Sequence, residues 1–364
     1  MRSFLKDFRD GLRALAPGRF PYARFAAALT LGAAGGWTFA QFNLPLPWML
    51  GAMTACTLGA LVHAPIAAPA VVRPPMTMVI GVLLGAGFKP EVLTLIPTWI
   101  PTILGLAGFV AACAAACVTY FRLVGGFDRT TAFFAGMPGG LVEMTVLGDE
   151  KGGDARTIAL VHSARVLLVV FTLPFLVQWL QGAWIGSRSR LGVSILEAPW
   201  TSDLWLVGAG VLGAVVGHAL RFPAKTLLGP MVVSALVHVL GLSDFTPPRE
   251  IVNAAQVGLG TVIGCRFLGA APREILRILG LSAGSTAILL AITLLFALLI
   301  SRVSPHGVVP LLLAYSPSGL AEMSLVALAL QIEVAFVAAR HIIRILFVML
   351  SAGPAFALMP EDDG

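Results

Sequence analysis

The sequence predicts an all-α polytopic membrane protein with a two-fold internal repeat, and three observations lead to this fold class. Hydrophobic residues make up 58% of the 364-residue chain and charged residues only 12%, whereas a soluble domain carries about 25% charged residues. The apolar residues form continuous runs, which favours helices over the alternating strands of a barrel. A short segment rich in glycine and proline also occurs twice, around Pro138 and Pro317.

The apolar runs fall into two series that match one for one. The first series comprises 25–42, 47–64, 75–88, 99–121, 131–147 and 157–180. The second comprises 204–220, 226–242, 255–269, 277–301, 307–330 and 333–358. We therefore expect a basic amphipathic cytoplasmic segment over 1–24, a first membrane repeat over 25–184, a linker over 185–203 and a second membrane repeat over 204–360.

The distribution of arginine and lysine bears on topology. Basic residues crowd the N-terminal 24 residues, and within them 1–16 has the spacing of an amphipathic helix on the cytoplasmic face. A solvated tail is the alternative for this segment. If the Pro-Gly segments do not cross the bilayer fully, each repeat has an odd number of crossings. The repeats are then inverted, with about ten transmembrane helices in all, and most basic loops lie inside. Six full crossings per repeat is the alternative.

The duplicated segment carries the strongest candidate site. The first copy contains Pro138, Gly139 and Gly140, and the second contains Pro317, Ser318 and Gly319. Proline lacks an N–H donor and glycine weakens a helix, so each copy should interrupt a helix and restart it. Inverted-repeat transporters place such broken helices at the substrate site. A kink or tight helix packing is the alternative interpretation.

Charged residues follow each interruption at matching positions. Glu143 and Glu322 lie five residues after the prolines, inside apolar runs where a carboxylate is costly. His162 with Arg165, and His341 with Arg344, each share one helical face. We expect each glutamate to pair with one of these arginines, and the histidines either to relay protons or to pack as hydrogen-bonding residues.

Outside the duplicated segments, one further arginine is a candidate site residue, and known cofactor motifs are absent from the sequence. Arg266 stands in an apolar run where the first repeat has Gly87, which suggests either a substrate-facing charge or a helix end. The sequence contains no P-loop, Rossmann fingerprint, HExxH or GxSxG motif, so no cofactor is expected. The four cysteines lie in apolar runs and are expected to be packing residues.

The doubled Pro-Gly-Gly-Leu-x-Glu-Met motif with its following His and Arg resembles the AbrB family of bacterial inner-membrane proteins. Members in Gram-negative bacteria carry two AbrB-type membrane modules, and the resemblance spans nearly the whole chain after residue 24. It implies a multi-pass protein of the inner membrane. Some members are labelled ammonia monooxygenases and others regulators of gene expression. This chain departs from the motif at Ser318, which puts equal roles of the two copies in doubt.

Three functions are compatible with these features. The leading hypothesis is a secondary transporter or permease for a small solute, with an anion as one candidate and a possible homo-oligomer in the lipid bilayer as the working unit. The second is a membrane-embedded regulator of gene expression that acts indirectly, without contacting nucleic acid. The third is a metal-dependent oxidase, which is disfavoured because an arginine beside each histidine would repel a cation. The chain is therefore not expected to be an enzyme.

Overall fold

A computed structural model describes residues 2–182 and 193–359, so the first part of the expected 185–203 linker lies outside the described residues. Five described helices are long and apolar enough to cross a membrane: Ile96–Leu123, Ala155–Gln181, Trp200–Ala219, Pro272–Ile300 and Val334–Ala357. Four shorter helices, Pro47–Leu61, Ala70–Gly85, Lys225–Val239 and Leu320–Ala329, are also apolar. These lengths are compatible with a membrane protein, because about 20 residues span the hydrocarbon core.

The chain forms two compact units, and each unit takes helices from both sequence repeats. Unit 1 comprises 1–93, 183–269 and 324–335, and unit 2 comprises 94–182, 270–323 and 336–364. The boundary between the repeats in the sequence is therefore not a boundary between compact units. Short α5 (Val92–Leu95) lies at the first junction, and α15 and α16 each begin in one unit and continue in the other.

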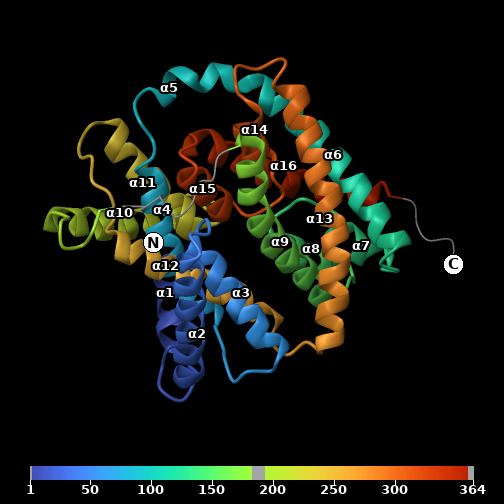
Figure 1. Cartoon of the computed structure of the whole chain (residues 1–364), viewed down its shortest axis with the longest axis horizontal. Coiled ribbons are helices and arrows are strands. Elements are labelled where there is room, and N and C mark those ends of the chain that lie inside the picture. The colour runs from blue at the N-terminus through green and yellow to red at the C-terminus, as the bar shows by residue number, and fades with distance from the viewer. Residues whose placement is uncertain (1, 183–192, 360–364) are drawn as a thin grey trace. The chain divides into compact units, whose positions relative to one another are not determined.

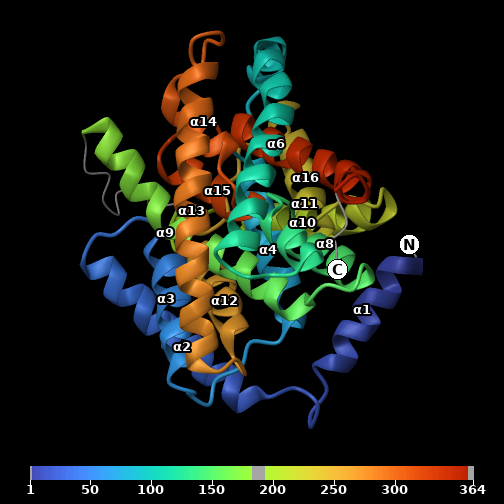
Figure 2. The ribbon, with the colours of Figure 1, turned by 90° about the vertical axis from the view of Figure 1, so that its right-hand side faces the viewer.

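The described part of unit 1 contains three main helices from each repeat. Those of the first repeat are α2 (Tyr22–Gln41), α3 (Pro47–Leu61) and α4 (Arg73–Gly85), with α1 (Arg2–Ala14) before them and η1 (Ala70–Val72) before α4. Those of the second are α10 (Trp200–Ala219), α11 (Lys225–Val239) and α12 (Arg249–Gly264), followed by η3 (Cys265–Phe267). The chain reaches α2 from α1 through a bend (Figure 2). A helix is thus present within 1–16, at Arg2–Ala14, as the sequence predicts.

The two repeats exchange helices reciprocally inside unit 1. Helix α4 packs on α11, and α12 packs on α3. A Cβ added to Gly85 of α4 would overlap backbone and Ser234 of α11, and a Cβ added to Gly264 of α12 would overlap backbone and Cys56 of α3. The two contacts occupy matching positions in the repeats. Glycine is required at both because two helix backbones approach closely there.

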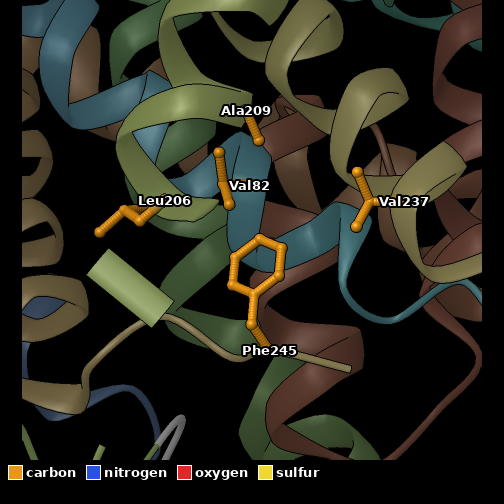
Figure 3. Close-up of a cluster of buried hydrophobic side chains, with 5 residues drawn as sticks. All are labelled: Val82, Leu206, Ala209, Val237 and Phe245. Carbon is orange, nitrogen blue, oxygen red and sulfur yellow. The ribbon is translucent and has the colours of Figure 1, made fainter. Parts of the chain in front are cut away.

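An apolar cluster fixes one side of unit 1. Figure 3 shows Val82 of α4 facing the ring of Phe245, with Leu206 and Ala209 of α10 and Val237 of α11 around them. All five side chains are buried. Phe245 belongs to the segment after α11, and its ring also stacks on Trp205. The cluster therefore joins a helix of the first repeat to two helices of the second.

The described part of unit 2 contains a long helix, a broken helix and a second long helix from each repeat. From the first repeat these are α6 (Ile100–Leu123), preceded by η2 (Ile96–Trp99), the pair α7 (Arg129–Gly136) and α8 (Leu141–Glu150), and α9 (Ala155–Gln181). From the second they are α13 (Pro272–Ile300), α14 (Val308–Tyr315) with the start of α15 (Leu320–Ala329), and most of α16 (Val334–Ala357). The residues of α15 and α16 within 324–335 belong to unit 1. Helices α6 and α13 run side by side (Figures 1 and 2).

Candidate functional site

Both predicted interruptions are present in unit 2. Helix α7 ends at Gly136, Met137 turns into extended backbone (φ −59°, ψ 134°), and α8 starts at Leu141. Helix α14 ends at Tyr315, Ser316 adopts nearly the same conformation (φ −54°, ψ 134°), and α15 starts at Leu320. The intervening residues are Pro138, Gly139 and Gly140 in the first turn and Pro317, Ser318 and Gly319 in the second. The first helix of each pair therefore ends with carbonyl groups that need donors from elsewhere.

In the first repeat, His162 and Arg165 of α9 supply those donors. The Nε2–H of His162 donates to the Phe134 carbonyl at 2.8 Å, and Nη1 of Arg165 donates to the Met137 carbonyl at 3.0 Å. Nη2 of Arg165 lies 2.5 Å from Nδ1 of His162. Because the carbonyl can only accept and the guanidinium can only donate, these bonds require the neutral Nε2–H tautomer of His162.

The second repeat repeats the two bonds to the helix end at matching positions, but its arginine binds a second turn carbonyl instead of the histidine. His341 donates through Nε2 to the Leu313 carbonyl at 3.1 Å. Arg344 donates through Nη1 to the Ser316 carbonyl and through Nη2 to the Ser318 carbonyl, the latter at 2.6 Å. A cation beside the C-terminus of a helix also interacts favourably with its dipole. The arginines and histidines therefore hold the carbonyl ends of α7 and α14.

The glutamates occupy the other side of each interruption. We expected Glu143 and Glu322 to pair with the arginines, but in the described parts of the chain no ion pair joins them. Each carboxylate instead folds back over the glycine at the start of its helix, and a Cβ added to Gly140 or Gly319 would overlap it. In place of the expected pairing, each arginine binds the carbonyl end of one helix and each glutamate lies at the start of the next, so each charge is near the helix end of opposite sign.

The two turns differ in burial and in hydroxyl groups. Glu143 is half-buried, whereas Glu322 is 4% exposed. Ser316 and Ser318 are buried, and the Oγ of each has no hydrogen-bond partner. Ser318 was a candidate from the sequence and Ser316 was not, although the same repeat register pairs Ser316 with Met137. Only the second turn therefore combines a buried carboxylate with two free hydroxyls.

The two turns belong to one packed unit. A Cβ added to Gly139 would overlap Val348 of α16, so the first turn lies against a helix of the second repeat. Helix α14 of the second repeat likewise packs against α9 of the first. Arg165 and Arg344 are close enough for their charges to interact. Arg266 lies apart from this set in sequence, half-buried in η3 of unit 1.

Arg340 of α16, one helical turn before Arg344, is a further buried cation. Its Nη2 and Nε donate to Oγ1 of Thr102 at 2.6 and 3.0 Å, and its Nη1 donates to the Phe336 carbonyl at 2.9 Å. The guanidinium lies 4.5 Å from the ring centre of Trp99 and 3.6 Å from that of Phe336. Aromatic faces stabilise a desolvated cation, so this arginine ties α16 to the start of α6.

The polar loop between α8 and α9 closes with a helix cap. Asp154 accepts hydrogen bonds from the N–H groups of Arg156 and Thr157 and from the Thr157 hydroxyl. Partial burial raises the pKa of Asp154, but these hydrogen bonds outweigh it, so the pKa lies below its usual value. The loop therefore sets the start of α9, whose next turns carry His162 and Arg165. Among the described residues, no three His, Cys, Asp or Glu side chains are grouped to hold a metal ion.

The chain is similar in sequence to a known protein family and to individual bacterial proteins. A sequence profile described as "Transition state regulatory protein AbrB" matches residues 48–359. The chain is 28% identical over 373 residues to "Uncharacterized protein YhjN" of Bacillus subtilis (strain 168), covering 92% of this chain and 93% of that one. It is 24% identical over 322 residues to "Putative regulator AbrB" of Escherichia coli (strain K12), covering 88% and 91%.

Proposed function

The chain belongs to the AbrB family, and from this premise we propose that it is a secondary transporter for a small solute, placed in the bacterial inner membrane as a multi-pass protein. The observation that carries the proposal is the pair of broken helices in unit 2, one from each repeat, with buried arginines on one side of each break. Irregular backbone at membrane depth is tolerated only where it is buried in protein or lines a cavity. Transporters with internal repeats place substrate and coupling ions at such breaks.

The proposed topology has two inverted repeats and about ten crossings, with α7/α8 and α14/α15 as the interrupted segments. The reciprocal exchange of α4 and α12 inside unit 1 supports a two-fold relation between the repeats. The excess of basic loops on one side supports the inverted orientation. The five helices with full crossing length and the four shorter apolar helices provide the material for these crossings.

The proposed roles follow from charge. Arg165 and Arg344 hold the turns in place and make the centre of unit 2 electropositive, which favours an anionic solute. Glu143 and Glu322 are the groups that can take up a coupling proton, because neither is committed to an ion pair among the described residues. Movement of a proton with the solute would keep the transported charge small.

Solute uptake into proteoliposomes tests the proposal. Wild-type protein should accumulate its solute when an inward proton gradient is imposed, and the double substitution Glu143→Gln and Glu322→Gln should abolish the response to the gradient. Glu274→Gln is the matched control, because Glu274 is 37% exposed and pairs with exposed Arg156 at 3.1 Å. Unchanged proton-driven uptake in the double variant contradicts the carboxylate role, and absence of uptake for every small anion and cation tried contradicts transport.

A second candidate function is a membrane-embedded regulator of gene expression. The name of the Escherichia coli relative, a putative regulator, favours it. This function predicts a soluble partner that binds the basic N-terminal segment, which contains α1. Deletion of residues 1–16 should then abolish a regulatory phenotype and leave the protein in the membrane. A phenotype that survives the deletion would exclude α1 as the output.

A further inference from the structure

The second turn of unit 2 contains more donor groups than its own structure uses. The hydroxyls of Ser316 and Ser318 and the Nε–H of Arg344 are all buried without a hydrogen-bond partner. Buried polar groups without partners are rare in folded proteins. Here three of them surround one turn, because Arg344 is bound to the carbonyls of both serines. The turn is therefore prepared to receive an acceptor.

The start of α15 adds further donors in the same place. The first N–H groups of a helix have no partner inside it and carry the positive end of its dipole. Anions bind at such positions. Gly319 begins α15, since its carbonyl accepts from the Met323 N–H at 3.1 Å. The donors of the turn and those of the helix therefore adjoin each other around Ser318 and Gly319.

A carboxylate already occupies this position in the structure, and it is the chain's own. Glu322 is 4% exposed, forms no ion pair among the described residues, and lies over Gly319, where an added Cβ would overlap it. The side chain thus takes the place that an anionic ligand would take at the N-terminus of α15. This position therefore has room for a carboxylate group.

The first repeat provides an internal comparison. Its Arg165 binds the Met137 carbonyl as Arg344 binds that of Ser316, but its Nη2 contacts His162 instead of a second turn carbonyl. Met137 and Gly139 stand where the second turn has Ser316 and Ser318. Glu143 is only half-buried, and α8 exposes Val142 and Val146. The first turn therefore keeps the architecture of the second without its free hydroxyls. This asymmetry assigns ligand binding to the second repeat.

We propose that the turn at residues 316–319 and the start of α15 bind a small monocarboxylate, which displaces the side chain of Glu322. Two ionised carboxylates repel each other at one helix end, so the ligand binds when Glu322 is protonated, and each anion enters with one proton. This inference rests on the proposed transport function and specifies its substrate class. The other buried titratable or charged groups on the helices packed around the turn are Tyr315 of α14, Cys113 and Cys117 of α6, His162 and Arg165 of α9, and Arg340, His341 and Arg344 of α16.

Binding of radiolabelled acetate to the purified full-length protein in detergent tests this site without requiring transport. Acetate has the same carboxylate group as the Glu322 side chain, attached to a single methyl group. Wild-type protein should bind it more tightly in acidic than in neutral buffer, because the ligand and the Glu322 carboxylate compete for one helix end. Glu322→Gln should retain binding and lose this pH dependence. Ser318→Gly, which restores the residue of the first turn, should weaken binding about tenfold or more, as expected for a hydrogen bond to a charged group.

Matched controls separate the site from general effects. Ser285→Ala removes a buried hydroxyl of the same unit that already donates to the Ser282 carbonyl at 3.1 Å, and it should bind acetate as the wild type does. Elution as one symmetric peak in size-exclusion chromatography shows that each variant is folded. For a variant that fails this check, Ser316→Ala gives an independent test of the free hydroxyls.

The outcomes distinguish this inference from the proposed function. Equal acetate binding by the wild type and Ser318→Gly, or no acetate binding by wild type and Glu322→Gln in acidic buffer, overturns the site and leaves buried water as the partner of the hydroxyls. Proton-driven uptake of another solute would in that case preserve the transport function. Binding with the expected pH dependence but without uptake into proteoliposomes would support the site and overturn transport.

Discussion

Replacement of Arg344 by methionine tests whether the geometry shared by the two turns depends on arginine side chains bound to carbonyl groups rather than on ion pairs. The substitution keeps an unbranched stem and removes the two donors that bind the carbonyls of Ser316 and Ser318. Each buried carbonyl left without a donor costs about 1–3 kcal/mol, so the predicted loss of stability is about 2–6 kcal/mol. Arg344→Lys keeps the charge but not the planar fork, and it should lose about half as much.

Thermal unfolding of the detergent-purified protein measures this loss. A change of 1 kcal/mol shifts Tm by about 2–4 °C in a protein of 150–250 residues, so Arg344→Met should lower Tm by several degrees at least. Arg302→Met is the control, because Arg302 is exposed between α13 and α14. A Tm for Arg344→Met within about 1 °C of the wild type refutes the capping role. Recovery of stability on adding Glu322→Gln would instead reveal an ion pair between Arg344 and Glu322.

Three further predictions concern the helix ends. Gly319→Ala should displace the carboxylate of Glu322 and change acetate affinity more than Gly140→Ala does. An added Cβ overlaps a carboxylate at both positions, but we propose ligand binding only at the second turn. Acetate-binding isotherms for both variants check this prediction. Asp154→Ala should lower stability by about 1 kcal/mol through loss of the α9 cap, whereas Asp154→Asn should lose less, as measured by thermal unfolding. A hydrogen bond from Lys225 holds the pKa of Asp7 below its usual value. The contact therefore helps to anchor α1 above the unfolded pKa of Asp7, and this contribution disappears as the pH falls through the lower folded pKa. Limited proteolysis should cut α1 faster in strong acid, and in Asp7→Asn it should do so already at neutral pH.

The positions of the helices and their interruptions could be predicted from the sequence. Continuous apolar runs gave the helices within a few residues, and proline next to glycine gave the breaks after Gly136 and Tyr315. Both signals are local, since they depend on the preferences of neighbouring residues. The amphipathic N-terminal helix followed from the same kind of pattern.

The partners of the charged residues could not be predicted in this way. The sequence shows that Arg165 and Glu143 both lie in apolar runs, and opposite charges suggest a pair. The structure instead places Arg165 on a carbonyl of residue 137 and Glu143 over Gly140. A backbone carbonyl leaves no mark in the sequence, because every residue has one. The division into units was also hidden, since it depends on contacts between segments far apart in the chain.

The exchange of helices in unit 1 has a consequence for how such a chain can arise and assemble. Because α4 of the first repeat packs on α11 of the second, and α12 of the second on α3 of the first, neither repeat alone can cover its own helices. An ancestor with a single repeat would have needed a second copy of itself. Two fragments cut between the repeats and expressed together should accordingly associate into one particle, whereas either fragment alone should aggregate.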